Sequence, residues 1–172
     1  FLATLNRCVL TDNTASGGGG GADSCALNNC LLTGNTAPEG GGTWGSTLTN
    51  CTLAGNSATS SGGGAFYSTL WNSIVFFNTA VTNGPNYWNP GGGFSLNYCC
   101  TTPLPTNGVG NLTDAPLFVD YPGGNLRLQA GSPGIDAGTN AYAAGPTDFD
   151  GLPRIVGGTV DLGAYEFQGA GP

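Results

Sequence analysis

The sequence contains no lysine, no histidine and no methionine, and arginine, its only basic residue, occurs three times in 172 residues. Nucleic acids and anionic membranes are bound through patches of basic side chains, which three separated arginines do not provide. Histidine and lysine are also common general bases, so their absence removes most proton acceptors for catalysis. Ten acidic residues give a net charge of −7. We therefore expect no nucleic-acid partner, no membrane insertion and no enzymatic activity.

Long apolar runs are absent as well. No run approaches the roughly 20 residues of a membrane-spanning helix, and no stretch carries a clear helical period. Glycine (32 residues) and proline (11 residues) are abundant, whereas charged residues make up 8% of the chain. The surface must therefore consist mainly of serine, threonine, asparagine and glycine. Such a surface is typical of secreted bacterial β-proteins, and we expect a secreted or cell-surface location.

A repeat of 21–22 residues organises the first half of the chain. Residues 5–15, 27–37, 48–58 and 70–80 share the pattern Leu-x-x-Cys-x-Leu-x-x-Asn-Thr/Ser-Ala, with Ser73 and Val75 as the exceptions in the fourth copy. Glycine clusters at residues 17–21, 40–42, 62–64 and 91–93 separate the copies. Apolar and polar residues alternate within each copy, as in half-buried strands. Each copy therefore reads as short strands joined at glycine-rich corners.

One such unit cannot bury its own apolar face, but stacked units can, because each leucine then lies on the leucine of the next coil. The sequence predicts an all-β fold, a right-handed parallel β-helix. Regular coils span residues 1–97, and irregular coils over residues 98–172 continue and cap the same solenoid. A leucine-rich repeat has a similar length, but its leucine frame and its helix are missing. An internal ladder of stacked asparagines is predicted at Asn13, Asn35, Asn56 and Asn78.

Two resemblances follow from these residues. Gly63-Gly64-Ala65 with the following Leu/Val-x-x-Asn resembles the polymorphic-outer-membrane-protein repeats of bacterial surface β-helices, over residues 1 to about 100. The tail over residues 98–168 resembles the choice-of-anchor Q domain of bacterial β-helix proteins, which implies a secreted or surface protein. Its motifs are Asp114–Asp120, Asn125–Leu128, Ser132–Gly138, Asp148–Arg154 and Val160–Glu166.

Six cysteines leave two alternatives open. Cys8, Cys30 and Cys51 occupy one column, where adjacent coils would bring their Cα atoms to roughly 4.8 Å, within disulfide range. A stack of free thiols in the core is the other reading. Cys99 and Cys100 are adjacent, so as disulfides they would bridge to different partners. Cys25 lies off the column and is the candidate for a bridge between subunits.

The sequence offers few acidic residues placed together in a way that catalysis or metal binding would need. A polysaccharide-cleaving β-helix needs paired carboxylates, but the column of Asp12 continues with glycines and Phe77, and that of Asp23 with Trp44 and Phe66. Gly18–Asp23 matches the calcium-binding nonapeptide once, without the tandem copies that such a site needs. Asp148 and Asp150 resemble half of a calcium loop. We favour turn formation for both segments, expect no cofactor and keep calcium as the weaker alternative.

The first coil suggests how the protein works. Phe1, Leu2 and Leu5 begin in the middle of a coil without a polar cap, and an uncapped coil exposes unpaired backbone groups. We expect head-to-tail self-association of an extracellular structural protein into a fibre, since such contacts do not close. One alternative is a carbohydrate-binding or polysaccharide-degrading β-helix, because aromatic residues on a face can bind extracellular glycans. Another is a fragment of a larger bacterial adhesin.

Overall fold

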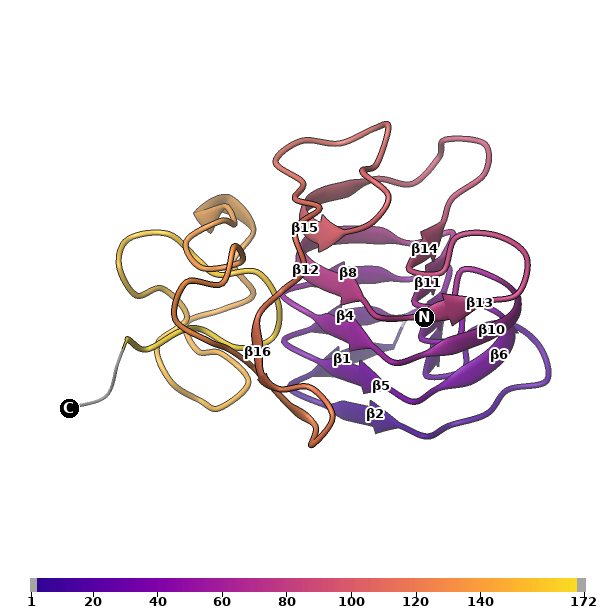
Figure 1. Cartoon of the computed structure of the whole chain (residues 1–172), viewed down its shortest axis with the longest axis horizontal. Helices are drawn as coiled ribbons and strands as arrows, with labels where there is room; N and C mark the ends of the chain where they lie inside the picture. Colours follow the sequence, from indigo (N-terminus) through magenta and orange to yellow (C-terminus); the bar gives the residue numbers. More distant parts are fainter. Residues whose placement is uncertain (1–2, 170–172) are drawn as a thin grey trace.

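The computed structural model describes residues 3–169 and confirms the predicted all-β class. Parallel strands stack into a β-solenoid of about four turns (Figure 1). Within residues 3–169 the only helix is a single 3-10 turn, η1 (Asn140–Tyr142). Phe1 and Leu2, two of the three residues expected at the assembly edge, lie outside the described residues.

Three parallel sheets form the walls of the solenoid. The first has two rows of strands that join in coil four. These are β1 (Thr4–Asn6), β4 (Ala26–Asn28) and β8 (Thr47–Thr49), then β2 (Val9–Thr11), β5 (Leu31–Thr33) and β9 (Thr52–Ala54), with β12 (Thr69–Phe76) and β15 (Leu96–Thr101) spanning both rows. The second contains β6 (Thr36–Glu39), β10 (Ser57–Ser61) and β13 (Thr79–Ala80). The third contains β3 (Ala22–Asp23), β7 (Thr43–Trp44), β11 (Ala65–Phe66) and β14 (Tyr87–Trp88).

The register matches the repeat of the sequence. Leu27 pairs with Leu5 on one side and Leu48 on the other, and Leu32 lies between Leu10 and Leu53. The side chains of Leu27, Leu32, Leu48 and Leu53 have no exposed surface. Full burial of a leucine stabilises a fold by about 1.5–3 kcal/mol. The two leucine columns therefore form the core of the rod.

Corners of the solenoid are made by single residues with left-handed backbone. One corner uses Arg7, Asn29, Asn50, Asn72 and Tyr98, a second uses Asp12, Gly34, Gly55 and Phe77, and a third uses Ser24, Gly45 and Tyr67. The glycine clusters have an additional purpose. A Cβ at Gly41 would collide with the carbonyl oxygen of Ser57 in the next coil, so glycine is needed there for close approach of two backbones.

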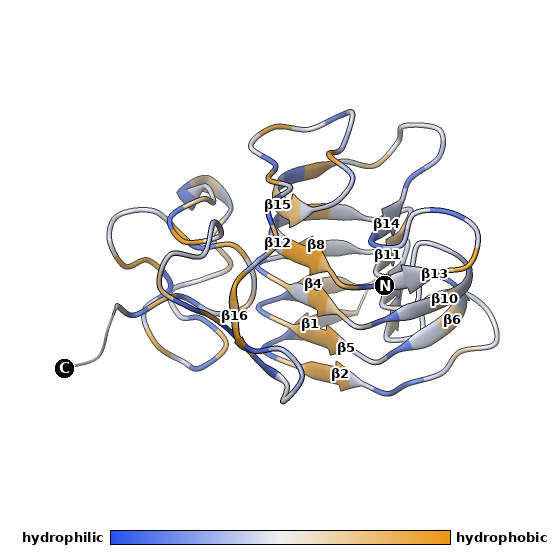
Figure 2. Cartoon of the chain, in the orientation of Figure 1, coloured by the Kyte–Doolittle hydropathy of each residue, from blue (hydrophilic) through white to orange (hydrophobic). Residues whose placement is uncertain are grey.

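Residues 113–169 lie elsewhere than the sequence predicts. The expected cap at the end of the stack instead runs along its flank, with β16 (Phe118–Asp120) and β17 (Asn125–Leu128) pairing antiparallel (Figure 1). The physical reason is an apolar outer face on the first sheet, which an exposed tail would leave in water. Leu31, Ala54 and Ile74 point outward from three coils and form a second core with the tail. Figure 2 shows apolar segments on the strands that face the tail.

Candidate functional site

Stacked asparagines connect the coils on the inside of the second corner. The backbone N–H and the side-chain Nδ2 of Asn13 both donate to Oδ1 of Asn35, at 3.1 and 2.9 Å. Asn35 donates in the same way to Asn56, and Asn56 to Asn78, at 2.9–3.0 Å. Asn35 and Asn56 are fully buried. All four residues predicted for the ladder therefore lie in one hydrogen-bonded column.

The other two corners carry ladders of the same polarity. At the first, the N–H of Cys8 approaches Sγ of Cys30 at 3.4 Å, that of Cys30 approaches Sγ of Cys51 at 3.4 Å, and that of Cys51 donates to Oγ of Ser73 at 3.1 Å. At the third, Cys25 donates to Ser46 and Ser46 to Ser68, at 3.1 and 3.2 Å. In every case a backbone N–H donates to a side chain of the following coil. The stack therefore has a direction, and its two ends differ chemically.

Three asparagines supply acceptors at the C-terminal end of the stack. Asn86 accepts from the N–H of Asn78 at 3.1 Å, Asn89 from that of Ser68 at 3.1 Å, and Asn111 from that of Cys99 at 2.9 Å. Asn86 and Asn111 follow their donors by 8 and 12 residues instead of 21 or 22. They belong to loops that fold back onto the stack, so the chain itself provides what a further coil would otherwise provide.

The outer edge of β15 is paired by the same returning loop. The N–H groups of Tyr98 and Thr101 donate to the carbonyls of Val109 and Leu112, at 2.7 and 2.9 Å. Leu112 in turn donates to the carbonyl of Cys99 at 2.8 Å. This side of the terminal coil is therefore closed. The roles of Asn86 and Asn111 are not predictable from the repeat, because both residues stand outside it among other loop asparagines.

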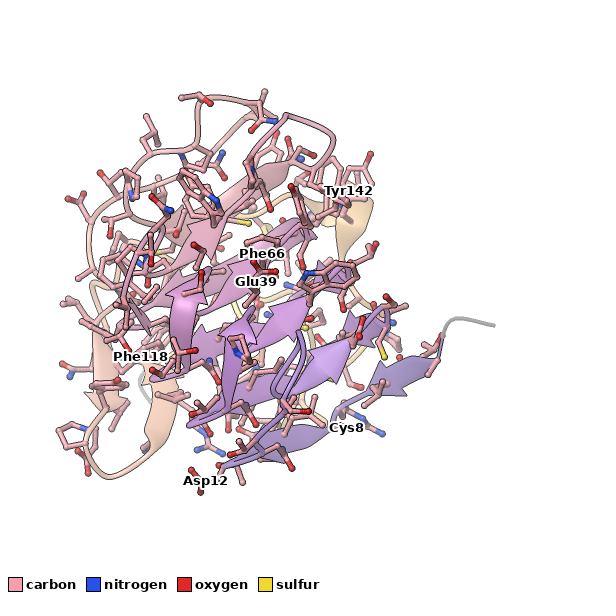
Figure 3. All side chains as sticks on the ribbon, turned by 90° about the vertical axis from the view of Figure 1, so that its right-hand side faces the viewer. Cys8, Asp12, Glu39, Phe66, Phe118 and Tyr142 are labelled. Carbon is pink, nitrogen blue, oxygen red and sulfur yellow. The ribbon has the colours of Figure 1, made fainter. Side chains whose placement is uncertain are left out.

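The N-terminal end of the stack is open. Cys8 and Asp12 belong to its first coil (Figure 3). Val9 is 55% exposed, whereas its register partner Leu31 is 8% exposed. Leu5 is half-buried, and within residues 3–169 no donor reaches Oδ1 of Asn13. This edge presents apolar side chains and unused acceptors in the positions where the inner coils contact one another.

All six cysteines are free thiols in the structure. The column predicted for Cys8, Cys30 and Cys51 is present. Of the two alternatives, disulfides or stacked free thiols, the structure has the free thiols. Burial is the main cause that raises the pKa of Cys51 well above its usual range. Burial also raises the pKa of Cys99 and of Cys100 to about 12, so these thiols stay protonated. Cys25 is half-buried near the open end.

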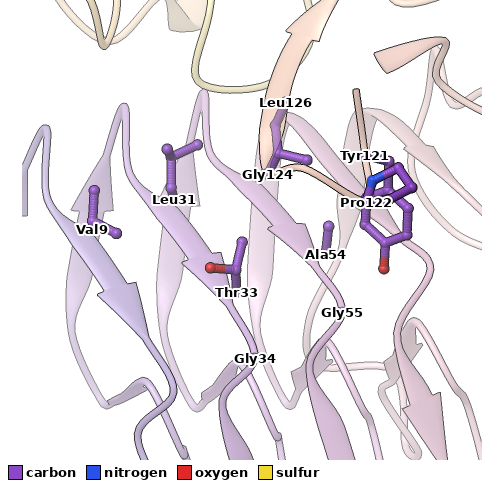
Figure 4. Close-up of a pocket in the computed structure, with 10 residues that line it drawn as sticks. All are labelled: Val9, Leu31, Thr33, Gly34, Ala54, Gly55, Tyr121, Pro122, Gly124 and Leu126. Atoms are coloured by element: carbon purple, nitrogen blue, oxygen red, sulfur yellow. The ribbon is translucent and has the colours of Figure 1, made fainter. Parts of the chain in front are cut away.

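A cleft of about 410 Å³ lies beside the open end, between the flank of the solenoid and the tip of the tail hairpin (Figure 4). Val9, Leu31 and Thr33 line it from the solenoid, and Tyr121 and Leu126 line it from the tail. It exists because the tail covers the outer face of the later coils more completely than that of the first. The apolar flank therefore continues to the edge of the stack.

A buried arginine holds the tail on the solenoid. Arg154 is 1% exposed and donates to the side chain of Asn29 at 3.2 Å, to the carbonyl of Ala164 at 2.9 Å and to Glu166 at 3.3 Å. Burial raises the pKa of Glu166 to about 7, against three hydrogen-bond donors that favour its charged form. Removal of the arginine would leave buried carboxylates without a counterion. The buried ion pair with Glu166 therefore stabilises the fold of the tail itself, and the hydrogen bond to Asn29 joins this arginine to the solenoid.

A second asparagine column, to which Asn29 belongs, binds the tail to the solenoid. Asn29, Asn50 and Asn72 occupy one corner in successive coils, and their buried side chains face the tail. Asn29 donates to the carbonyl of Ala144 at 2.7 Å, and Asn50 to that of Asp161 at 3.1 Å. Asn72 both donates to and accepts from the backbone of Thr139, at 2.9 and 2.8 Å. Three rungs are thereby fixed to one tail.

The carboxylates of both calcium candidates, Asp148 and Asp150, are already bonded to other groups of the protein. Asp148 is buried and accepts from the backbone N–H groups of Leu152 and Glu166, at 2.9 and 3.0 Å. Asp150 forms a bidentate ion pair with Arg127, at 2.6 and 2.8 Å. Residues 3–169 gather no group of three or more His, Cys, Asp or Glu side chains that could hold a metal ion. In the same part of the chain no helix is long and apolar enough to cross a bilayer.

No family model, no curated protein and no solved structure matches the chain.

Proposed function

We propose that the chain is a structural segment of an extracellular β-solenoid rod, which accepts a further rung at its N-terminal end and terminates the stack at its C-terminal end. The observation that carries this proposal is the unequal state of the two ends. One end exposes Val9 and an unused acceptor on Asn13. At the other end Asn86 and Asn111 already accept from the N–H groups of Asn78 and Cys99, where a further coil would otherwise supply the acceptors.

The proposed occupant of the open end is a rung of the same 21–22-residue repeat. Such a rung would place its corner asparagine N–H and Nδ2 on Oδ1 of Asn13, as Asn13 does on Asn35 at 3.1 and 2.9 Å. An outward apolar residue would cover Val9 in the way that Val9 pairs with Leu31. Unpaired strand edges are templates for this kind of addition.

Repeated head-to-tail stacking is less favourable in this geometry. The incoming first coil would have to displace residues 109–112 from the edge of β15, where they already pair with Tyr98, Cys99 and Thr101. Breaking these hydrogen bonds costs free energy, whereas a rung that binds at the open end breaks none. A rod with one growing end therefore fits better than a filament of identical subunits. Its extracellular location is supported by the low share of charged residues, 8% of the chain, and by the resemblance to surface β-helices.

Insertion of an extra coil tests the proposal. A copy of residues 26–46 placed before Thr4 keeps the register, because Ala26 pairs with Thr4 and with Thr47. We expect the extended chain to unfold at a higher urea concentration than the wild type, with slower hydrogen exchange in residues 4–13. A matched control carries the same insert with its copies of Leu27, Leu32 and Asn35 changed to serine, and it should give no gain.

Two results would overturn the proposal. One is an extended chain no more stable than its serine control. The other is electron microscopy of the wild-type chain at high concentration that shows strings longer than a dimer, which requires pairing at the end described as closed.

A further inference from the structure

A second cavity lies at the closed end of the rod, far along the stack from the open coil. It has a volume of about 400 Å³ and is formed by β14 and by residues 103–106 of the returning loop. Its walls include Pro85, Tyr87, Trp88, Pro103 and Thr106. Pockets of roughly 300–1,000 Å³ are the usual size for small ligands. The rod function proposed above makes no use of this cavity.

The walls of the cavity combine flat apolar faces with a few polar groups. Two aromatic rings and three prolines line it, and no charged side chain does. Tyr87 and Trp88 are half-buried, and Thr106 is exposed. Among the hydrogen bonds of residues 3–169, none uses the Tyr87 hydroxyl, the Trp88 indole N–H or the Thr106 hydroxyl, whereas Asn89 is engaged on both sides by Ser68. Tyr87 packs against the core of the solenoid, so the Trp88 indole N–H and the Thr106 hydroxyl are the two polar groups left for a ligand on the outer face.

The ionisation of the chain restricts the chemistry of that ligand. Burial raises the pKa of Tyr87, so this wall of the cavity stays uncharged as well. The net charge of the chain is −7, which repels anions such as uronic acids. A neutral pyranose fits these properties, since it has apolar C–H faces for an aromatic ring and hydroxyl groups at its edge for hydrogen bonds.

Trp88 also continues an aromatic column on the outer face of the third sheet. Its register partner is Phe66, and the partner of Phe66 is Trp44. Tyr67 packs against Phe66 and Phe94 with ring centroids 4.5 and 5.5 Å apart. Phe66 appears on the face viewed in Figure 3. The cavity therefore lies at the end of an aromatic column that follows the third sheet from coil to coil.

We propose that the cavity at Trp88 binds a neutral mono- or oligosaccharide, with one pyranose ring stacked on the indole and a hydroxyl group bonded by Thr106. The rod would then attach to a glycan near its closed end.

Titration calorimetry and NMR test this site on the intact chain. The probes are glucose, maltose, cellobiose, chitobiose and mannobiose, with digalacturonate as the anionic comparison. We expect at least one neutral probe to bind. Trp88→Ala should weaken that binding by a factor of ten or more, and Thr106→Val by a few-fold. Trp44→Ala, which removes the same ring type two rungs away, should leave binding unchanged.

A readout on the wild type covers the case in which Trp88→Ala does not fold. The chain has three tryptophans, so its ¹H–¹⁵N spectrum contains three indole signals, which single Trp→Phe variants assign. The bound sugar should shift the Trp88 signal and leave those of Trp44 and Trp71 in place. Absence of binding by every neutral probe, binding of digalacturonate alone, or a shift confined to Trp44 or Trp71 would overturn the proposal. None of these results changes the outcome expected for the extended rod.

Discussion

Removal of one buried asparagine from the ladder should destabilise the protein far more than removal of an asparagine at its open end. In Asn56→Ala, the N–H of Asn35 loses its acceptor at 3.0 Å and the carbonyl of Leu32 loses its donor at 2.8 Å. Both groups stay buried. Each unpaired buried backbone group costs about 1–3 kcal/mol, so we expect a loss of roughly 2–6 kcal/mol in the free energy of unfolding.

Asn13→Ala is the matched control. Its own Nδ2 disappears, but Oδ1 of Asn35 keeps the backbone N–H of Asn13 at 3.1 Å. Asn13 is exposed, so water can replace the missing contact and the loss should be below about 1 kcal/mol. Urea unfolding followed by circular dichroism measures both variants. If the two losses differ by less than about 1 kcal/mol, the ladder does not carry the energy that its hydrogen bonds imply.

The tail, the pH dependence and the thiols give three further predictions. Arg154→Met should lower the free energy of unfolding by about 3–5 kcal/mol and expose the tail to limited proteolysis, because it leaves buried carboxylates without a counterion. Arg127→Met, which breaks an exposed ion pair, should lower it by under about 1 kcal/mol. Equal losses in the two variants would refute the structural role of Arg154. The pKa of Glu166 rises on folding from 4.5 to about 7 because of burial, so the folded state binds the extra proton and stability should fall as the pH rises from 4.5 to 7. Calorimetric melting of Glu166→Gln should show a flatter profile over that range, and a profile identical to the wild type would contradict the assignment. Iodoacetamide should label only the half-buried Cys8 and Cys25 in the native protein and all six thiols after unfolding without reductant, whereas fewer than six labels by mass spectrometry would point to the disulfide alternative.

The repeat made the solenoid predictable, because the residues that face inward are the same in each coil. Leu27, Leu48 and Leu70 recur at fixed spacing and pair directly in the structure. The asparagine column could be read from the sequence for the same reason. The corners could not all be read, since Arg7, Asn50 and Tyr98 share a left-handed backbone without sharing a side-chain type.

The position of the tail left no comparable signal in the sequence. Its contacts with Asn29 and Asn72 join residues 115 and 67 positions apart and use backbone carbonyls as acceptors. The burial of Arg154 could not be predicted, because it depends on partners that only the folded tail brings together. Outward apolar residues such as Leu31 and Ile74 were the available hint that the flank needed a cover.

Native-state hydrogen exchange by NMR tests the difference between the two ends of the rod most directly. The N–H groups of Tyr98, Cys99 and Thr101 should be protected to the same degree as that of Cys51 in the middle of the stack, since the returning loop supplies acceptors at 2.7–2.9 Å. Exchange of these three amides at the rate of an unprotected strand edge would contradict a closed C-terminal end, and with it the account of a rod that can be extended from one side only.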